Sequence, residues 1–118
     1  MKVIVYNISQ EDKKILALAN RKKHTITIIV YPLNETTVHF AEAKDAVTII
    51  DQETPVSDSL ILKLISFGVK HFIFRFQEHV LIDLSIIQDA GLKYIIIQDS
   101  ELAISSIIEM LDAWSKND

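Results

Sequence analysis

The side chains best suited to chemistry lie in one short segment that follows an apolar run. The run His71-Phe72-Ile73-Phe74 leads directly into the candidate ligand-binding site, which consists of Arg75, Phe76, Gln77, Glu78 and His79. An arginine, a glutamate and a histidine at the carboxyl end of a strand could bind a small polar ligand or transfer a proton. The sequence favours the plainer alternative, a surface loop in which Arg75 pairs with a neighbouring carboxylate.

The composition argues against several other kinds of site. The 118 residues include no cysteine, which excludes a disulfide, a thiolate metal site and a cysteine nucleophile. Two glycines are too few for the loops that cradle phosphates, so we expect no cofactor. The four histidines form no i, i+4 pair, and we expect no metal site. A net charge of −4 argues against a nucleic-acid partner or an anionic membrane surface.

Asp51 stands where a receiver domain of an α/β fold carries its phosphoacceptor, directly after the expected third strand. Phosphotransfer there would need further acids after the first strand and a lysine after the fifth, to hold Mg²⁺ and the phosphate charge. The sequence has Asn7-Ile8 and Gln98-Asp99 at those places. We therefore expect Asp51 to be a solvated loop residue.

These candidate residues must be positioned by an alternation of strand-like and helix-like segments. Short β-branched apolar runs are typical of parallel strands buried on both faces, and we expect them at 3–6, 25–31, 46–50, 71–74 and 93–97. Amphipathic or capped segments predict helices at 9–24, 34–43, 57–67, 84–90 and 100–115. The alternation predicts a three-layer, flavodoxin-like (Rossmann-like) α/β fold, a doubly wound parallel sheet of order 2-1-3-4-5.

The apolar spacing also predicts which side chains face the core. In the first helix we expect a buried stripe of Ile15, Leu16, Leu18 and Ala19; in the second, Val38, Phe40 and Ala41; in the last, Ile104, Ile107, Ile108, Leu111 and Trp114. Both glycines, Gly68 and Gly91, stand between a helix and the following strand, where a left-handed residue closes the helix.

The order of several short motifs resembles the amino-terminal, substrate-binding (catalytic) domain of D-lactate dehydrogenases, in the family of D-isomer-specific 2-hydroxyacid dehydrogenases. The similar segments are Met1–Tyr6, Tyr31-Pro32-Leu33-Asn34-Glu35-Thr36-Thr37, Asp45-Ala46-Val47-Thr48-Ile49, Phe67-Gly68-Val69-Lys70, Phe74-Arg75 with Ile82-Asp83-Leu84, and Ala90-Gly91-Leu92-Lys93. The resemblance extends over residues 1–97. It implies a flavodoxin-like domain that, in the family, closes over a separate NAD-binding domain.

The resemblance also implies what is absent from these 118 residues. The family's catalytic arginine, glutamate and histidine and its GxGxxG motif lie in the second domain, so none can be carried over. After the fourth strand the family has Ser-Ala-Gly, whose backbone binds the substrate carboxylate, whereas this sequence has Phe76-Gln77-Glu78. We therefore expect a chain that is not an enzyme on its own.

Three functions stay open at this point. The first is a stand-alone, catalytically incomplete relative of the substrate domain that binds a small ligand, such as a carboxylate, or has a regulatory role. The second is a protein-interaction module, a homodimer or one with another protein partner, to which Trp114 could contribute. The third is a dehydrogenase subunit completed in trans by an NAD-binding subunit. We expect one domain over residues 1–118, in the cytoplasm, with no membrane segment.

Overall fold

The computed structural model describes residues 1–21, 23–51, 56–76, 84–98 and 103–116. Five parallel strands form one sheet in the order β2-β1-β3-β4-β5, and this confirms the predicted Rossmann-like α/β topology. The strands are β1 (Lys2–Tyr6), β2 (Thr25–Ile29), β3 (Ala46–Ile50), β4 (His71–Phe76) and β5 (Lys93–Gln98). The helices are α1 (Gln10–Asn20), the 3₁₀ helix η1 (Val38–Ala41), α2 (Asp58–Ser66), α3 (Ser85–Asp89) and α4 (Ala103–Lys116).

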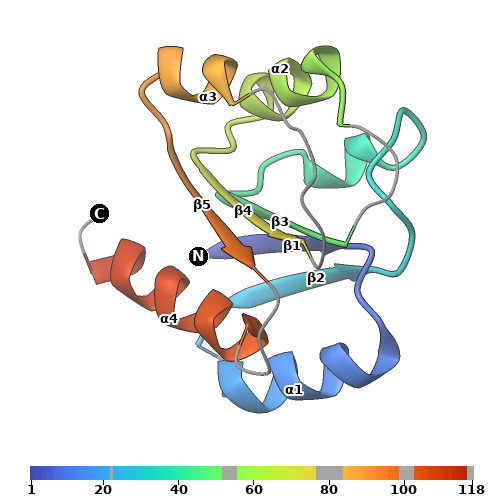
Figure 1. Ribbon diagram of the computed structural model, residues 1–118, viewed down its shortest axis with the longest axis vertical. Helices are drawn as coiled ribbons and strands as arrows, with labels where there is room; N and C mark the ends of the chain where they lie inside the picture. The colour runs from blue at the N-terminus through green and yellow to red at the C-terminus, as the bar shows by residue number, and fades with distance from the viewer. Residues whose placement is uncertain (22, 52–55, 77–83, 99–102, 117–118) are drawn as a thin grey trace.

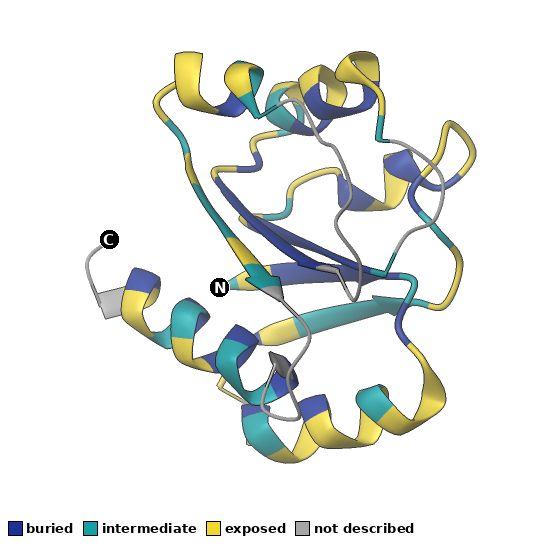
Figure 2. Cartoon of the chain, in the orientation of Figure 1, coloured by how far each residue is buried: buried dark blue, intermediate teal, exposed yellow. Residues whose placement is uncertain are grey.

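The helices cover the sheet in two layers. Figure 1 shows α1 and α4 on one face and η1, α2 and α3 on the other. Alternate residues of β1 point to opposite faces, so that Val3 and Val5 join the cluster under α1 and α4, whereas Ile4 and Tyr6 join the cluster under η1, α2 and α3. The central strands β1, β3 and β4 are therefore buried on both sides (Figure 2).

Helix α4 carries the apolar stripe that its sequence predicts. Its five inward residues are all buried: Ile104, Ile107, Ile108, Leu111 and Trp114. The ring of Trp114 stacks on His71 of β4, with ring centroids 4.9 Å apart. This contact places Trp114 inside the fold, against the start of a central strand.

The stripe predicted for α1 is wrong at two positions. Leu16 is buried and Ala19 is half-buried, but Ile15 is 42% exposed and Leu18 is 77% exposed. Helix α1 packs against α4 and the margin of the sheet, so only a narrow side of it is covered. Its start agrees with the sequence, because the Ser9 hydroxyl accepts the backbone N–H of Asp12 at 3.2 Å.

The helix predicted for residues 34–43 is reduced to one turn, η1. The Asn34 side chain accepts the backbone N–H groups of Thr36 and Thr37, and the Tyr6 hydroxyl donates to the Thr37 carbonyl at 2.8 Å. These bonds satisfy backbone groups that a longer helix would need, so the segment stays a turn. Phe40 is 47% exposed and does not join the core as predicted, whereas Val38 and Ala41 do. Burial raises the pKa of Tyr6.

Both glycines end helices as predicted. Gly68 has φ +101° and Gly91 has φ +70°. After α2, Gly68 N donates to Ile65 O and Val69 N donates to Leu64 O, the two bonds of a Schellman motif, and the turn after α3 repeats this pattern. The last carbonyls of both helices are thereby satisfied within the backbone.

A polar contact joins α4 to the turn before β2. His24 is buried, and its Nε2 lies 2.8 Å from Asp112 Oδ1, while Lys23 Nζ lies 3.1 Å from Asp112 Oδ2. The hydrogen bond with His24, followed by the bond with Lys23, holds the pKa of Asp112 below its usual value, although burial opposes this shift. Asp112 thus fixes α4 to the α1 side of the sheet.

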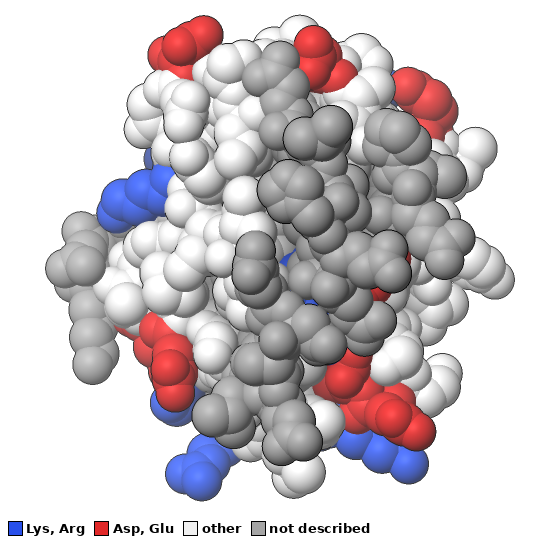
Figure 3. Space-filling view, in the orientation of Figure 1, with Lys and Arg blue, Asp and Glu red and all other residues white. Residues whose placement is uncertain are grey.

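Charged side chains are dispersed over the face drawn in Figure 3, where acidic and basic groups lie in small separate sets. None of the helices described is both long and apolar enough to cross a membrane.

Candidate functional site

Arg75 lies at the carboxyl end of β4, inside the fold. The strand continues to Phe76, two residues beyond the predicted end, so Arg75 is a strand residue that is only 6% exposed, not part of a surface loop. Its Nη1 lies 2.7 Å from Asp51 Oδ2 and 3.4 Å from Asp12 Oδ2. The predicted pairing of Arg75 with a neighbouring carboxylate is confirmed, and the predicted exposure is wrong.

Asp51 follows β3 directly and lies beside Arg75. In the register of the two strands Ile50 is the partner of Arg75, and the Asp51 N–H donates to the Arg75 carbonyl at 2.7 Å. Asp51 has φ +48°, a left-handed conformation that aspartate and asparagine tolerate better than most residues. Asp51 therefore lies in a loop, as expected, but it is half-buried and held by both its backbone and its carboxylate rather than solvated.

Asn7 completes the arrangement at the end of β1. It is also left-handed, with φ +65°, and its side-chain amide donates to the carbonyls of Ile50 at 2.8 Å and Asp51 at 3.2 Å. In the order 2-1-3-4-5, the chain switches direction between β1 and β3, and ligands of open α/β sheets bind at such switch points. Asn7 and Asp51 thus fix the backbone at the edge of the sheet where a ligand is expected.

The charges of the described residues at this edge are unequal. One guanidinium faces two carboxylates, so the cluster Asp12, Asp51 and Arg75 carries a net negative charge when all three groups are ionised. The contact with Asp51 is short, whereas that with Asp12 is longer and comes from α1. Asp51 can therefore orient the guanidinium while the Asp12 contact is exchanged for another acceptor.

The predicted site is described only in part. The structure brings Arg75 to the sheet edge and ends β4 at Phe76, while Gln77, Glu78 and His79 lie outside the described residues. The sequence reasoning did not connect Asn7, Asp12 and Asp51 with Arg75. The signal that could have done so is their position, because the carboxyl ends of neighbouring parallel strands and the helix starts that follow them meet at one edge.

Known structures show what this arrangement is similar to. The chain matches a D-lactate dehydrogenase from Salmonella with a TM-score of 0.73 and 28% identity, over 82% of this chain and 30% of that chain. It matches the apo-structure of D-lactate dehydrogenase from Escherichia coli with a TM-score of 0.74 and 27% identity, over 86% and 32% of the two chains. The chain is similar in structure to part of the D-lactate dehydrogenases. This finding confirms the resemblance found in the sequence.

The similarity extends over only part of the length of the D-lactate dehydrogenases. The chain spans about 30% of these structures, and D-2-hydroxyisocaproate dehydrogenase, at 20% identity and a TM-score of 0.70, shares the fold to the same extent. No family model and no curated protein matches the chain. The regulatory, interaction and trans-complementation roles, and the choice of ligand, stay predictions.

Proposed function

We propose that the chain is a small-ligand-binding or regulatory relative of the D-lactate dehydrogenase substrate domain, with Arg75 as the group that binds a ligand carboxylate. The observation that carries this proposal is the buried guanidinium at the carboxyl end of β4, oriented by Asp51 at 2.7 Å. A planar guanidinium can bind a carboxylate through two hydrogen bonds, and a fixed orientation lowers the entropic cost of binding.

The second carboxylate determines how a ligand would enter. A ligand carboxylate beside Arg75 would be repelled by the negative charges of Asp12 and Asp51, so binding requires that one of these carboxylates lose its contact with the guanidinium. Asp12 is the group to be exchanged, because its contact is the longer one at 3.4 Å. Replacing Asp12 should therefore strengthen carboxylate binding, an effect opposite to that expected of a residue that binds the ligand itself.

The test is saturation-transfer NMR of the protein with a panel of 2-hydroxy acids and 2-oxo acids, and with NADH in parallel. We expect signals from members of the acid panel, their loss in Arg75→Met, and about threefold to tenfold tighter binding in Asp12→Asn. Arg21→Met is the matched control, because Arg21 is the chain's other arginine and is exposed. The proposal would be overturned if no acid of the panel gave a saturation-transfer signal, or if Arg75→Met bound the acids as tightly as the unsubstituted chain.

A second candidate, a protein-interaction module, is favoured by the apolar side of α1 that the fold leaves uncovered. Leu18 is 77% exposed and Ile15 is 42% exposed, and Tyr31, after the edge strand β2, is 67% exposed. Multi-angle light scattering of the purified chain tests homodimer formation. A dimer that Leu18→Gln converts to a monomer would support this function, and a monomer at all concentrations would count against self-association.

A further inference from the structure

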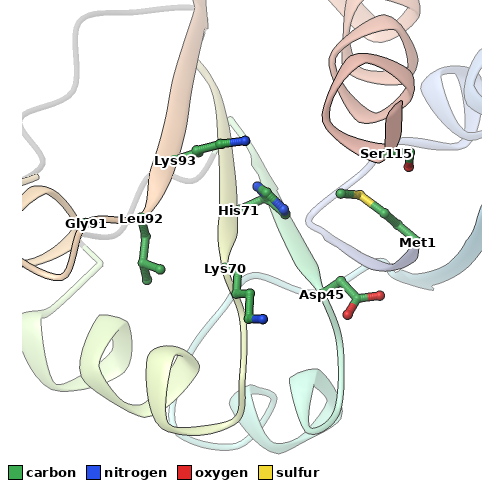
Figure 4. A pocket seen from close by; sticks show the side chains of 8 residues that line it. All are labelled: Met1, Asp45, Lys70, His71, Gly91, Leu92, Lys93 and Ser115. Atoms are coloured by element: carbon green, nitrogen blue, oxygen red, sulfur yellow. The ribbon is translucent and has the colours of Figure 1, made fainter. Parts of the chain in front are cut away.

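The cavity at the amino ends of the strands does not gather its charged groups around one place. It measures about 720 Å³ and lies at the starts of β4 and β5. Figure 4 shows the Lys70 ammonium group directed toward Asp45. Lys93 is the register partner of His71 and extends in another direction (Figure 4). A different cavity, of about 540 Å³, lies between α1 and the edge strand β2, and it borders the free edge of the sheet.

The backbone of β2 faces β1 and the outside of the sheet in alternation. The Thr25 N–H donates to the Met1 carbonyl at 3.0 Å, and the Ile29 carbonyl accepts the Asn7 N–H at 2.9 Å. In a parallel pair only alternate residues of a strand bond to a given neighbour, so the even-numbered residues of β2 turn their N–H and C=O groups outward. These outward residues are Ile26, Ile28 and, just after the strand, Val30. Within the part of the chain that the structure describes, β2 pairs with β1 alone.

The set of outward backbone groups ends at a definite residue on each side. Before it, the N–H and C=O groups of His24 are both bonded to the Asn20 side chain, each at 3.0 Å. After it, the next outward position is Pro32, which has no N–H to donate. The set is therefore symmetric about its middle residue, Ile28.

The edge of β2 lacks the side chains that keep edge strands of different molecules apart. Natural proteins place charged residues, especially lysine, on exposed edges for this purpose. The sequence between Lys23 and Glu35 contains no aspartate, glutamate, lysine or arginine. The other edge strand, β5, begins with the exposed Lys93. At the edge of β2 the exposed side chain is instead the apolar Val30, and the edge is open to an added strand.

The cavity beside β2 has room for the side chains of an added strand. Its apolar lining comes from Leu16 and Ala17 of α1 and from Ile26 and Ile28 of β2. Side chains directly opposite each other in an antiparallel pair lie on the same face, about 4.5–5.5 Å apart at Cβ. An added strand would therefore place its side chains beside Ile26 and Ile28, over the apolar cavity.

We propose that the occupant is a second copy of this chain, whose β2 pairs antiparallel with β2 about a two-fold axis at Ile28. This register sets Ile28 opposite Ile28 of the partner subunit and Ile26 opposite Val30 of the partner subunit, so it bonds all the outward N–H and C=O groups of the set. His24, whose backbone is already bonded, then lies opposite Pro32 of the partner subunit. A register shifted by one pair would set Val30 opposite His24 of the partner subunit and waste its bonds. This match of both ends favours a second copy over an unrelated strand.

The proposal rests on the second function proposed above, the protein-interaction module, and specifies its surface and its partner. A two-fold axis through the paired strands continues the sheet through both copies and keeps the two α1 helices on one face. Strands β1 and β3 separate β2 from β4, so the function proposed for Arg75 does not depend on this pairing.

Amide hydrogen exchange at increasing protein concentration tests the pairing, with multi-angle light scattering to follow the dimer. The N–H groups of Thr27 and Ile29 face β1 and should be protected at all concentrations. Those of Ile26, Ile28 and Val30 should become at least about tenfold more protected as the dimer forms. A mixed sample of labelled and unlabelled chain should show an intermolecular NOE between Thr27 and Ile29 of the partner subunit, which this register sets opposite each other.

Matched variants separate the edge from general effects of charge. Val30→Lys should weaken dimer formation at least about tenfold, because it places a cation at the pairing edge. Leu62→Lys is the control, because it makes a similar change on α2, where Leu62 is 54% exposed and Val30 is 46% exposed. Circular dichroism melting confirms that each variant folds.

The outcomes separate this proposal from the wider function. A dimer whose Ile26 and Ile28 amides stay unprotected, or equal effects of the two lysine variants, would overturn pairing through β2 and leave the interaction function proposed for α1. A monomer at all concentrations up to about 1 mM would overturn this proposal and self-association together.

Discussion

The ion pair between Arg75 and Asp51 gives the sharpest test of the sheet edge. Asp51→Asn removes the negative charge but keeps the size of the side chain, and asparagine tolerates the left-handed backbone at this position. The variant leaves the guanidinium of Arg75, 6% exposed, with Asp12 at 3.4 Å as its carboxylate partner on α1. The substitution therefore isolates the effect of charge compensation in a buried setting.

The size of the effect follows from the burial of the two partners. Removing one partner of a fully buried ion pair costs about 3–5 kcal/mol. Here the Asp51 side chain is 28% exposed and Asp12 retains its contact, so we expect a smaller loss of about 2 kcal/mol. For a chain of this length, that loss lowers the melting temperature by about 8 °C.

Urea denaturation followed by circular dichroism measures the free energy of unfolding. Glu42→Gln serves as the control, because Glu42 is exposed and the substitution also removes one negative charge. The double variant Asp51→Asn/Arg75→Met should recover at least about 1 kcal/mol relative to Asp51→Asn, since it also removes the buried cation whose short contact with Asp51 has been lost. A loss in Asp51→Asn no larger than that of the control, or no recovery in the double variant, would refute the reasoning.

Three further predictions concern the rest of the fold. The hydrogen bond with His24 lowers the pKa of Asp112, so the ionised Asp112 side chain stabilises the fold above the ordinary carboxyl pKa, and this stabilisation is lost as pH falls through the lowered pKa of the folded state. Urea denaturation between about pH 6 and pH 3 should therefore show a smaller loss of unfolding free energy in Asp112→Asn than in the unsubstituted chain. Leu16→Ala should cost about 2–5 kcal/mol and Leu18→Ala less than about 0.5 kcal/mol, and equal losses on urea denaturation would contradict the placement of α1. Gly68→Ala should cost about 1–2 kcal/mol through its backbone conformation, since no atom beyond the two neighbouring residues lies within 4 Å of the added methyl group. A crystal structure of the variant should show an unchanged φ, and unchanged stability would contradict the prediction.

The sheet could be predicted from the sequence because its signals are local and redundant. The β-branched strands, the caps at Ser9 and Ser57 and the helix-ending glycines each agree with the same topology. The stripe of α4 could be predicted for the same reason, since its five apolar residues recur at helical spacing and the helix packs on the middle of the face.

The incorrect prediction for Leu18 and the unpredicted contacts of Arg75 have a common physical origin, because both depend on where a residue lies relative to the margin of the sheet. Leu18 has the spacing of a core residue, but it is 77% exposed, and none of the elements that the structure describes covers that side of α1. The relation of Arg75 to Asp51 and Asp12 joins residues 24 and 63 positions apart, and no local pattern encodes that separation. These contacts follow from the order of the strands and from the length of β4. The sequence indicated the order, but it did not specify how far β4 extends.

The order in which the elements are synthesised has a consequence for how this fold is reached. β1 is made first, yet it lies in the middle of the sheet and pairs with both β2 and β3. Its face with Val3 and Val5 is covered by a cluster that includes Leu111 and Trp114 of α4, the last helix described. During synthesis on the ribosome α1 can cover only part of that apolar face, and the rest stays exposed until α4 emerges. Completion of the fold therefore depends on contacts of long sequence separation, and the nascent chain is exposed to aggregation until then.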